Sequence, residues 1–340
     1  METETNPPIR EIKSSTPNLK ARLAGILIFL IPLIILLLSY SNERKKNGAD
    51  AIIEIKKPFS EVNILAKAAY VWDIENQKAI YAKNEKERLP LASLTKVMTA
   101  LVAMEEGNGS EKVRITPDAI KQEGDSGLKS GEKWKLKDLI DFSLVTSSND
   151  GIYAVASAIE SQKSISATSA PAEMTDNAKS RSDTDQARKN FVDLMNEKAK
   201  GISLSQTSYL NATGLDASGS ENGGYGSAED TAKLFAYIIK NKPEVLEATA
   251  YGKIKLTSLD KISHTAQNTD EIVAMIPNLI ASKTGYTDIS GGNLVVAFDL
   301  GLMRPIVISV LGSTREGRFE DMKKLIESAA NYLTENDRAR

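Results

Sequence analysis

Two side chains at the start of an apolar stretch could act as a nucleophile and its base. Ser93 and Lys96 are the first and last residues of the run SLTK, after which apolar residues recur at helical spacing. Three residues along a helix make nearly one turn, so the Ser93 hydroxyl and the Lys96 amine can lie on one face. A serine at a helix N-terminus also lies beside unpaired backbone N–H groups, which can stabilise a developing oxyanion. The pattern predicts nucleophilic catalysis by a serine with a lysine base.

The composition excludes most other catalytic chemistries. The chain of 340 residues contains no cysteine, which rules out disulfides, thiolate metal sites and a cysteine nucleophile. It contains one histidine, His264, so a histidine-rich metal site is excluded and a Ser-His-Asp triad would have to use that residue. His264 lies in a polar stretch and is interpreted as structural. Lys and Arg number 43 against 45 Asp and Glu, so the chain lacks the basic footprint of a nucleic-acid-binding protein.

Two further polar motifs could complete a site around this pair. The run from Ser147 to Asn149 lies between two predicted apolar helices, where a tight loop can direct polar side chains into a cleft. The triplet Lys283, Thr284 and Gly285 ends a strand-like run, and its glycine would let a ligand approach the backbone closely. The two motifs are therefore expected to line the same cleft from the helical side and the sheet side.

Each motif is weak alone, because the chain also contains imitations of it. S-x-x-K recurs at Ser126, Ser130 and Ser258, S-x-N recurs at Ser220, and K-S-G begins at Lys129. These imitations lie in polar, glycine-rich or loop-like contexts, without the helix or strand that the chemistry needs. The ordered set is more specific: S-x-x-K on a helix start, then S-x-N, then K-T-G on a strand. Penicillin-binding proteins and class A β-lactamases share that order, with S-D-N as the middle motif.

The chain resembles the serine-type D-Ala-D-Ala carboxypeptidases, the low-molecular-mass penicillin-binding proteins of peptidase family S11. The resemblance covers roughly residues 62–335 and includes longer matching segments at 91–100, 211–215, 283–288 and 314–319. It implies removal of the terminal D-alanine from pentapeptide stems during peptidoglycan biosynthesis, through an acyl-enzyme on the serine of SLTK. It also implies that β-lactams acylate this serine as covalent inhibitors, and that the reaction needs no metal and no cofactor.

The same resemblance implies a role for each motif residue. Lys96 would activate Ser93, and the backbone N–H of that serine would form part of the oxyanion hole. As catalytic residues, Ser147 and Asn149 would position substrate and relay a proton. Lys283 and Thr284 would bind the substrate carboxylate, with Arg318 as a weaker candidate, and Gly285 would line the substrate-binding site.

Lys96 can serve as a base only if its pKa is lowered. A free lysine has a pKa near 10.4, so at neutral pH it carries the proton that a base must lack. Partial burial and the positive charge of Lys283 would both lower this pKa. The sequence therefore predicts an enclosed site in which the two lysines lie close together.

An α+β domain is expected to position these motifs. Strand-like runs lie near both ends of the domain, and helical periodicity dominates between them. The economical arrangement is one antiparallel sheet built from both chain ends with an inserted helical region. The resemblance implies the same arrangement, a β-lactamase/transpeptidase-like fold. The expected strands are 68–73, 78–83, 278–283, 294–298 and 306–311, and the expected helices are 93–104, 136–145, 150–159, 191–200, one capped by Ser227 and one from about Glu316.

An uncharged apolar run at Leu23–Tyr40 is predicted to anchor the chain in the cell membrane. At about 1.5 Å per residue, 18 helical residues span about 27 Å, close to the hydrocarbon thickness of a bilayer. A short tail (1–22) precedes it and a polar linker (41–62) follows. A cleaved signal peptide is the alternative, although Ser39–Ser41 is a weak cleavage site. Positive residues flank both sides, so the extracytoplasmic placement of the catalytic domain (63–335) is inferred from its expected substrate.

Residues 161–186 form a second distinctive segment. They are rich in Ser, Ala and Thr and contain few large apolar residues, so they cannot repay the entropy of ordering. We expect a disordered surface insertion in the catalytic domain, and a partner-binding loop is the alternative.

Two other functions share some of these features. A class A β-lactamase would use a glutamate between the second and third motifs for deacylation, and Glu173 and Glu244 lie in that interval. Neither stands in an E-x-x-L-N context, which argues against efficient drug hydrolysis. A non-catalytic, membrane-tethered sensor of β-lactams or peptidoglycan would not need an intact nucleophile and base.

Overall fold

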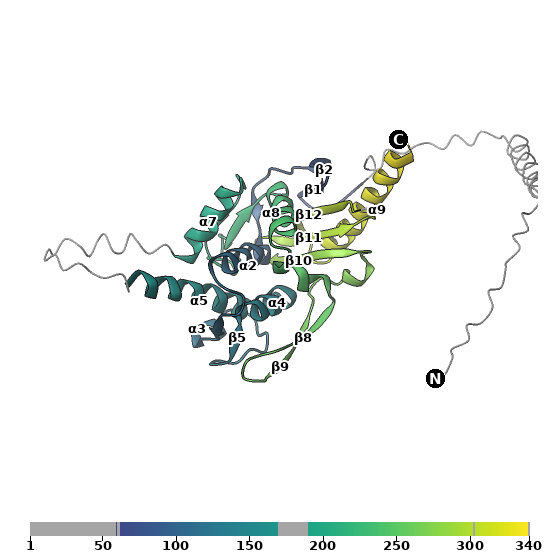
Figure 1. Ribbon diagram of the computed structural model, residues 1–340. Coiled ribbons are helices and arrows are strands. Elements are labelled where there is room, and N and C mark those ends of the chain that lie inside the picture. Colours follow the sequence, from purple (N-terminus) through teal and green to yellow (C-terminus); the bar gives the residue numbers. More distant parts are fainter. Residues whose placement is uncertain (1–58, 60–61, 169–189, 302, 339–340) are drawn as a thin grey trace, which may run out of the picture. The chain divides into compact units, whose positions relative to one another are not determined.

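A computed structural model describes residues 59, 62–168, 190–301 and 303–338 (Figure 1). The predicted membrane segment at 23–40 lies outside the described residues, as do the tail before it and nearly all of the linker after it. Within the described part of the chain, no helix is both long and apolar enough to cross a bilayer.

One five-stranded antiparallel sheet joins the early and late parts of the domain. Its strands lie in the order β10-β11-β12-β1-β2, and β1 pairs with β12 along its whole length. The first two strands have the bounds that the sequence predicts, whereas the last three run further. The prediction of an α+β fold with a sheet from both chain ends is confirmed. The strands are β1 (Ala68–Asp73), β2 (Lys78–Lys83), β10 (Leu279–Thr287), β11 (Gly291–Asp299) and β12 (Pro305–Ser313).

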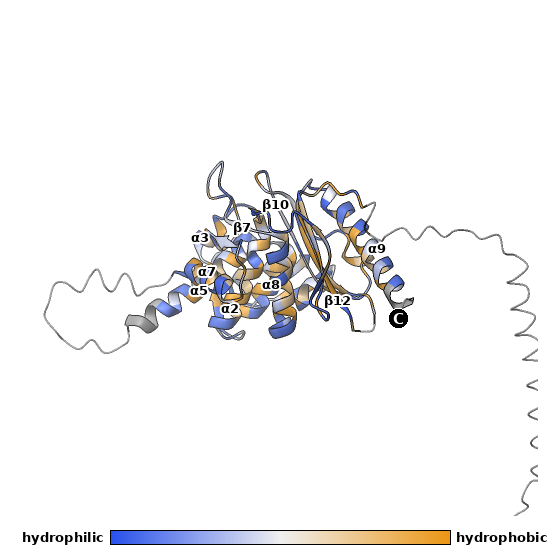
Figure 2. Cartoon of the chain, turned by 90° about the horizontal axis from the view of Figure 1, so that it is seen from above, coloured by the Kyte–Doolittle hydropathy of each residue, from blue (hydrophilic) through white to orange (hydrophobic). Residues whose placement is uncertain are grey.

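Helices cover both faces of this sheet, and alternate residues of β11 contact different ones. Leu294 and Val296 belong to the apolar cluster that α9 (Gly317–Arg338) completes, whereas Val295 and Ala297 belong to the cluster on the helical side. Successive side chains of a strand point to opposite faces, so both clusters need apolar residues from the same strand. Figure 2 shows the sheet between α9 and the helical region. The continuous apolar run of β11 is therefore explained by burial on both faces.

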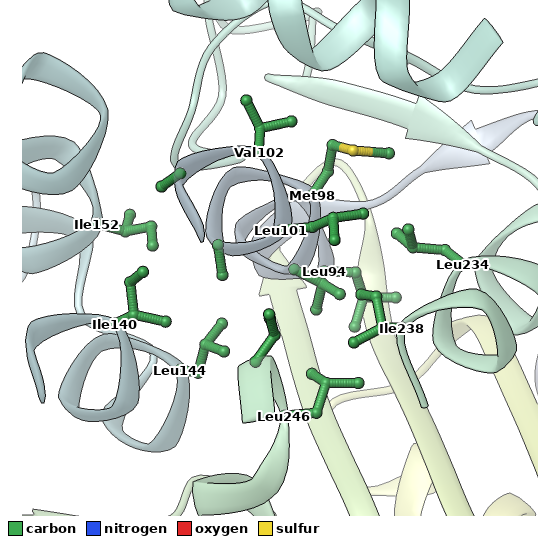
Figure 3. Packing of buried hydrophobic residues seen from close by; sticks show 14 of the residues in the cluster. Leu94, Met98, Leu101, Val102, Ile140, Leu144, Ile152, Leu234, Ile238 and Leu246 are labelled. Carbon is green, nitrogen blue, oxygen red and sulfur yellow. The ribbon is translucent and has the colours of Figure 1, made fainter. Parts of the chain in front are cut away.

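Helix α2 (Thr95–Glu106), which contains Lys96, runs through the centre of the helical region. Every residue from Thr95 to Ala103 is buried, as expected for a helix that is surrounded on all sides. Leu94, Met98 and Leu101 pack among apolar side chains of the neighbouring helices (Figure 3). This packing gives the catalytic motif a rigid support. The labelled neighbours include side chains of α4 (Leu136–Thr146), α5 (Asn149–Thr168) and α8 (Ala228–Asn241).

Short elements connect these layers, and several of their pairings were not predicted. Small sheets form from β3 with β7 and β6, from β4 with β5, and from β8 with β9. The predicted cap of α8 is confirmed, since the Ser227 side chain accepts a hydrogen bond from the backbone of Asp230. The remaining elements are β3 (Leu89–Pro90), η1 (Ala92–Leu94), β4 (Lys112–Arg114), α3 (Pro117–Ile120), β5 (Lys133–Lys135), α7 (Phe191–Gly201), β6 (Ser208–Tyr209), β7 (Gly224–Gly226), η2 (Pro243–Val245), η3 (Glu247–Ala250), β8 (Lys253–Thr257), β9 (Ser263–Gln267) and η4 (Val273–Met275).

Three boundaries differ from the sequence prediction. Ser93 lies in the 3₁₀ turn η1, and the α-helix begins only at Thr95. The K-T-G triplet lies inside β10, not at its end, because the strand continues to Thr287. Helix α5 continues to Thr168, past the predicted start of the insertion at 161, and the rest of that insertion up to 186 lies outside the described residues.

Candidate active site

The turn that carries Ser93 is held in an unusual backbone conformation. Ala92, the residue before it, has a φ of 49°, in the left-handed region that only glycine adopts without cost. Such a residue costs about 1–3 kcal/mol, and the surrounding structure must enforce it. Gly214 packs directly against this turn, because a Cβ on that glycine would lie 1.9 Å from the carbonyl oxygen of Ala92.

The Lys96 amine is fully buried and has three hydrogen-bond partners. Its Nζ lies 2.8 Å from Ser93 Oγ, 2.6 Å from Asn149 Oδ1 and 2.7 Å from the carbonyl oxygen of Thr213. The amide of Asn149 is oriented by its other end, since its Nδ2 donates to the carbonyl oxygen of Glu123 at 2.7 Å. Its oxygen therefore faces the lysine.

A neutral amine can satisfy all three of these partners. The oxygens of Asn149 and Thr213 can only accept hydrogen bonds, whereas the hydroxyl of Ser93 can also donate one. A neutral amine has two N–H groups for the two carbonyl oxygens and one lone pair for the serine hydroxyl. The geometry thus fits Lys96 as the base that takes the proton of Ser93.

The electrostatic environment favours the same protonation state. Burial, followed by the positive charge of Lys283, lowers the pKa of Lys96 well below its ordinary value, and the carboxylate of Asp150 opposes this shift. Burial and the charge of Lys283 are thus the two causes that the sequence predicts for a lowered pKa of Lys96.

Lys283 connects the second and third motifs. Its Nζ donates to Ser147 Oγ at 2.9 Å and to the carbonyl oxygen of Thr284 at 2.9 Å. Ser147 ends α4 in the left-handed conformation, with a φ of 59°, which turns its side chain toward β10. Burial, followed by the charge of Arg318, lowers the pKa of Lys283 to about 7, and Asp270 opposes this shift. The three predicted motifs therefore meet in one site.

The K-T-G strand approaches the nucleophile turn very closely. A Cβ on Gly285 would lie 2.8 Å from the carbonyl oxygen of Leu91 and 3.3 Å from the backbone nitrogen of Ser93. Thr284 is held by a 2.5 Å hydrogen bond between its Oγ1 and that of Thr269. Glycine is thus required here by contact with the opposite wall of the site.

Arg318 lies behind the strand and supports its backbone. Its side chain is buried, and its Nη1 donates to the carbonyl oxygen of Gly285 at 2.8 Å. Burial lowers its pKa from the ordinary value, followed by the effect of Arg315. This contact fixes the K-T-G segment from the side of α9, and direct binding of substrate by Arg318 stays a prediction.

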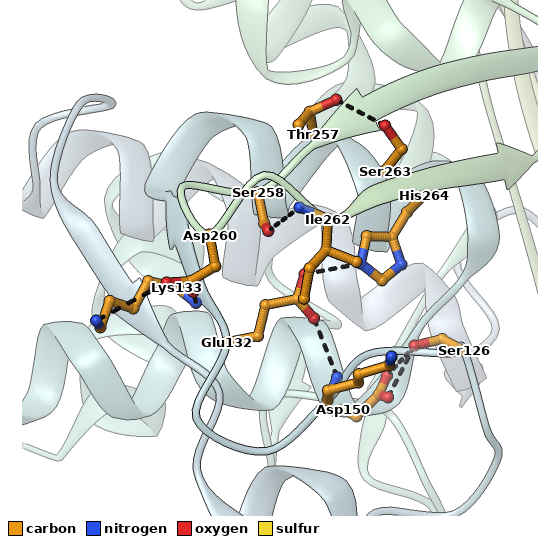
Figure 4. Close-up of polar contacts among 11 residues, drawn as sticks. Ser126, Glu132, Lys133, Asp150, Thr257, Ser258, Asp260, Ile262, Ser263 and His264 are labelled. Carbon is orange, nitrogen blue, oxygen red and sulfur yellow. Dashed lines mark hydrogen bonds and ion pairs between the residues drawn. The ribbon is translucent and has the colours of Figure 1, made fainter.

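His264 and the imitation motif at Ser126 have structural contacts (Figure 4). The Nε2 of His264 lies 2.7 Å from Glu132 Oε1, and its ring packs 5.2 Å from that of Trp134. Ser126 Oγ donates to the carboxylate of Asp150 at 2.6 and 2.7 Å. These contacts support the interpretation of His264 as structural and account for Ser126 without a catalytic role.

Three features of the site carry little sequence signal. The acceptor at Thr213 is a backbone carbonyl, and the roles of Gly214 and Asn222 depend on contacts with a turn more than a hundred residues earlier. The resemblance of segment 211–215 points to Thr213 and Gly214, whereas Asn222 lies beyond it, at the end of the S-x-N imitation that begins at Ser220.

Comparison with known proteins places the chain in a family. The sequence model of the family described as D-alanyl-D-alanine carboxypeptidase, peptidase S11, matches residues 55–165 and 184–314, which is more than half of the chain. The chain belongs to peptidase family S11. The match is interrupted between 165 and 184, within the segment that we interpret as an insertion in the S11 domain.

Two curated S11 relatives show the extent of the similarity. The chain is 29% identical over 279 residues to D-alanyl-D-alanine carboxypeptidase DacF of Bacillus subtilis, over 80% of this chain and 64% of that protein. It is 27% identical over 295 residues to DacD of Escherichia coli, over 82% and 66%. The chain thus spans slightly less than two thirds of the length of these relatives.

Solved structures share the S11 fold. Penicillin-binding protein D2 from Listeria monocytogenes, in its ampicillin-bound form, is 26% identical with a TM-score of 0.61, over 79% of this chain and 98% of that one. The carboxypeptidase DacD from Francisella tularensis is 23% identical with a TM-score of 0.66, over 83% and 75%. The penicillin-binding, transpeptidase-like architecture that the resemblance implies is confirmed.

Proposed function

We propose that this S11 protein is a serine D-Ala-D-Ala carboxypeptidase that removes the terminal D-alanine of peptidoglycan stem peptides. The observation that carries the proposal is the contact between Lys96 Nζ and Ser93 Oγ at 2.8 Å, with two obligate acceptors on the other sides of the amine. The names of the S11 relatives supply the substrate class.

The reaction begins with proton transfer from Ser93 to the neutral Lys96 amine. The serine oxygen then attacks the carbonyl carbon of the scissile peptide bond, and the backbone N–H of Ser93 faces the developing oxyanion. When the tetrahedral intermediate collapses, the C–N bond breaks and the leaving D-alanine amine takes up the proton that Lys96 received from Ser93. Water then hydrolyses the ester, with Lys96 again as the base, and restores the serine hydroxyl.

The substrate binds along β10. This strand lies at the edge of the sheet, so one side of its backbone can pair with an extended peptide. The ammonium of Lys283 and the hydroxyl of Thr284 would bind the terminal carboxylate. Because Gly285 lies against the nucleophile turn, a peptide on this edge places its last amide bond near Ser93.

β-Lactams would acylate the same serine. Solved structures of penicillin-binding protein D2 from Listeria monocytogenes are described as ampicillin-bound and cefotaxime-bound. The alternative of a class A-like β-lactamase needs a glutamate that activates water beside the acyl-enzyme. Glu173 lies outside the described residues, and among the described contacts none joins Glu244 in η2 to Ser93 or Lys96.

The proposal includes a membrane anchor at residues 23–40, with the catalytic domain on the extracytoplasmic side, where peptidoglycan lies. The uncharged run of 18 residues supports the anchor. Its cleavage would instead release the domain, and N-terminal sequencing of the mature protein would distinguish the two.

A covalent adduct on Ser93 is the expected result of brief exposure to benzylpenicillin. Mass spectrometry should show one added penicilloyl group per chain, and peptide mapping should place it on Ser93. The same preparation should release D-alanine from a D-Ala-D-Ala peptide. An adduct that disappears within minutes without D-alanine release would favour the β-lactamase, and a folded protein with no adduct would favour the sensor.

The catalytic efficiency on peptides with a free carboxylate is expected to fall as the pH rises above about 7. Burial lowers the pKa of Lys283 to about 7, so this residue is charged below that pH and neutral above it. Loss of its charge weakens carboxylate binding, which raises KM. Because kcat/KM reports the free enzyme, its pH profile measures this change directly. A thioester substrate without a terminal carboxylate is the control, and a peptide profile that stays flat to pH 9 would contradict the prediction.

A further inference from the structure

Asn222 is a fully buried amide that contacts both walls of the site. Its Oδ1 accepts hydrogen bonds from the backbone nitrogens of Ala92 at 3.2 Å and Gly224 at 3.1 Å. Its Nδ2 donates to Asp216 Oδ1 at 2.6 Å and lies 3.4 Å from Thr287 Oγ1. None of these contacts belongs to the three motifs.

Asp216 extends this link to β10. Its Oδ1 accepts from Asn222 and also from Thr287 Oγ1, at 3.1 Å. Thr287 is the last residue of β10, two positions after Gly285. A chain of hydrogen bonds therefore runs from the residue before the nucleophile, through Asn222 and Asp216, to the end of the K-T-G strand.

The two segments that these hydrogen bonds join come from different parts of the fold. The nucleophile turn is η1, which leads into the buried helix α2, whereas β10 belongs to the sheet. They lie close together at Gly285, where a Cβ would lie 3.3 Å from the backbone nitrogen of Ser93. A peptide bound along β10 therefore meets the Ser93 hydroxyl at a distance that depends on how these two segments are held together.

The left-handed conformation of Ala92 also depends on Asn222. A residue with a φ of 49° persists only where its surroundings enforce it. The hydrogen bond from its N–H to Asn222 satisfies the buried donor that this conformation directs inward. The amide thus supports both the shape of the turn and its position.

We propose that Asn222, together with Asp216, is a positioning residue that fixes the nucleophile turn against β10 and so sets the rate of acylation. This inference rests on the proposed function. The carboxylate partners Lys283 and Thr284 have no contact with Asn222 among the described hydrogen bonds, so substrate affinity should change little. Substitutions of Asn222 should therefore change the rate of acylation rather than substrate affinity.

An asparagine suits this place because one side chain must accept from backbone N–H groups and donate to a carboxylate. Alanine removes both functions. Aspartate keeps the acceptor, but it would put two carboxylates at the 2.6 Å contact that now joins Asn222 to Asp216. Exchanging the two residues restores one amide and one carboxylate at that contact.

The test compares Asn222→Ala, Asn222→Asp and the exchange of Asn222→Asp with Asp216→Asn in the full chain. We measure the acylation rate with a fluorescent penicillin, and kcat and KM on a D-Ala-D-Ala peptide. Misplacement of reacting groups by about 1 Å can cost about 100-fold in rate, so Asn222→Ala should lower acylation and kcat by about 10- to 100-fold. KM should stay within about threefold, and the exchange should recover most of the loss of Asn222→Asp.

Asn196→Ala is the matched control for loss of a structural amide. Asn196 holds the backbone of Tyr209 with bonds of 2.8 and 2.9 Å and joins α7 to β6. None of its described hydrogen bonds reaches Ala92, Asn222 or Asp216, so this variant should acylate at the wild-type rate. If Asn222→Ala does not fold, Thr287→Val breaks the link at its other end and should slow acylation with KM unchanged.

Three results would overturn the inference. They are wild-type acylation by a folded Asn222→Ala protein, a rise in KM with kcat unchanged, and an exchange variant no faster than Asn222→Asp alone. A wild-type protein that is never acylated at Ser93 would instead refute the proposed function.

Discussion

Replacing Lys96 with alanine is expected to slow acylation of Ser93 by penicillin by about 100- to 10,000-fold, the range that general-base catalysis supplies. The amine is the only nitrogen that the described hydrogen bonds place next to Ser93 Oγ, and its other partners leave its lone pair for that hydroxyl. The rate of adduct formation, followed by mass spectrometry, measures the loss. Lys96→Arg should be as slow, because a guanidinium stays protonated.

The control for this variant removes a lysine with a structural contact. Lys198 bonds Glu105 at 2.6 Å and the hydroxyl of Tyr237 at 2.9 Å, away from the nucleophile. Lys198→Ala should acylate at the wild-type rate, and circular dichroism should show that both variants are folded. A folded Lys96→Ala protein that reacts as fast as the wild type would refute lysine as the base.

Replacing Gly214 with alanine is expected to disable the site and destabilise the domain. The added methyl group would lie 1.9 Å from the carbonyl oxygen and 2.6 Å from the carbonyl carbon of Ala92, both backbone atoms. The turn before the nucleophile must therefore move. The overlap should cost about 1–3 kcal/mol of unfolding free energy, and the φ of 77° should add about 1–2 kcal/mol for a residue with a Cβ. Acylation should fall by about 100-fold or more.

Gly219→Ala is the matched control in the same loop. A Cβ at Gly219 would meet no atom within 4 Å, and its φ is not in the left-handed region. Its unfolding free energy should stay within about 0.5 kcal/mol of the wild type, with full acylation. Thermal unfolding and penicillin labelling of both variants test the pair. Equal behaviour of the two would show that the contact with Ala92 does not matter.

Parts of the site and fold could be predicted where the signal is local, within one helix turn or one strand. The one-turn spacing of Ser93 and Lys96 predicts their contact, and the strand-like runs predict the bounds of β1 and β2. The prediction that K-T-G ends its strand was wrong. Tyr286 and Thr287 continue β10 although neither is strongly apolar. A polar strand end has no periodic signal to extend.

Other features depend on pairings between distant segments. Glu132 and His264 are 132 residues apart, so nothing local indicates their 2.7 Å contact. The acceptor from Thr213 is a main-chain atom, which every residue possesses. The last two turns of α5 have a Ser- and Ala-rich composition, which predicts disorder because helix propensity without an apolar face is a weak signal.

Because β1 pairs with β12, the sheet can be completed only after almost the whole domain has been synthesised. During synthesis, the β1–β2 hairpin and helix α2 emerge first, and an isolated hairpin is only marginally stable. A nascent chain that has reached α8 contains Ser93 and Lys96 but not Lys283, whose charge lowers the pKa of Lys96. An incomplete polypeptide of this length therefore contains the nucleophile but lacks strand β10 and the Lys283 charge that lowers the pKa of its base.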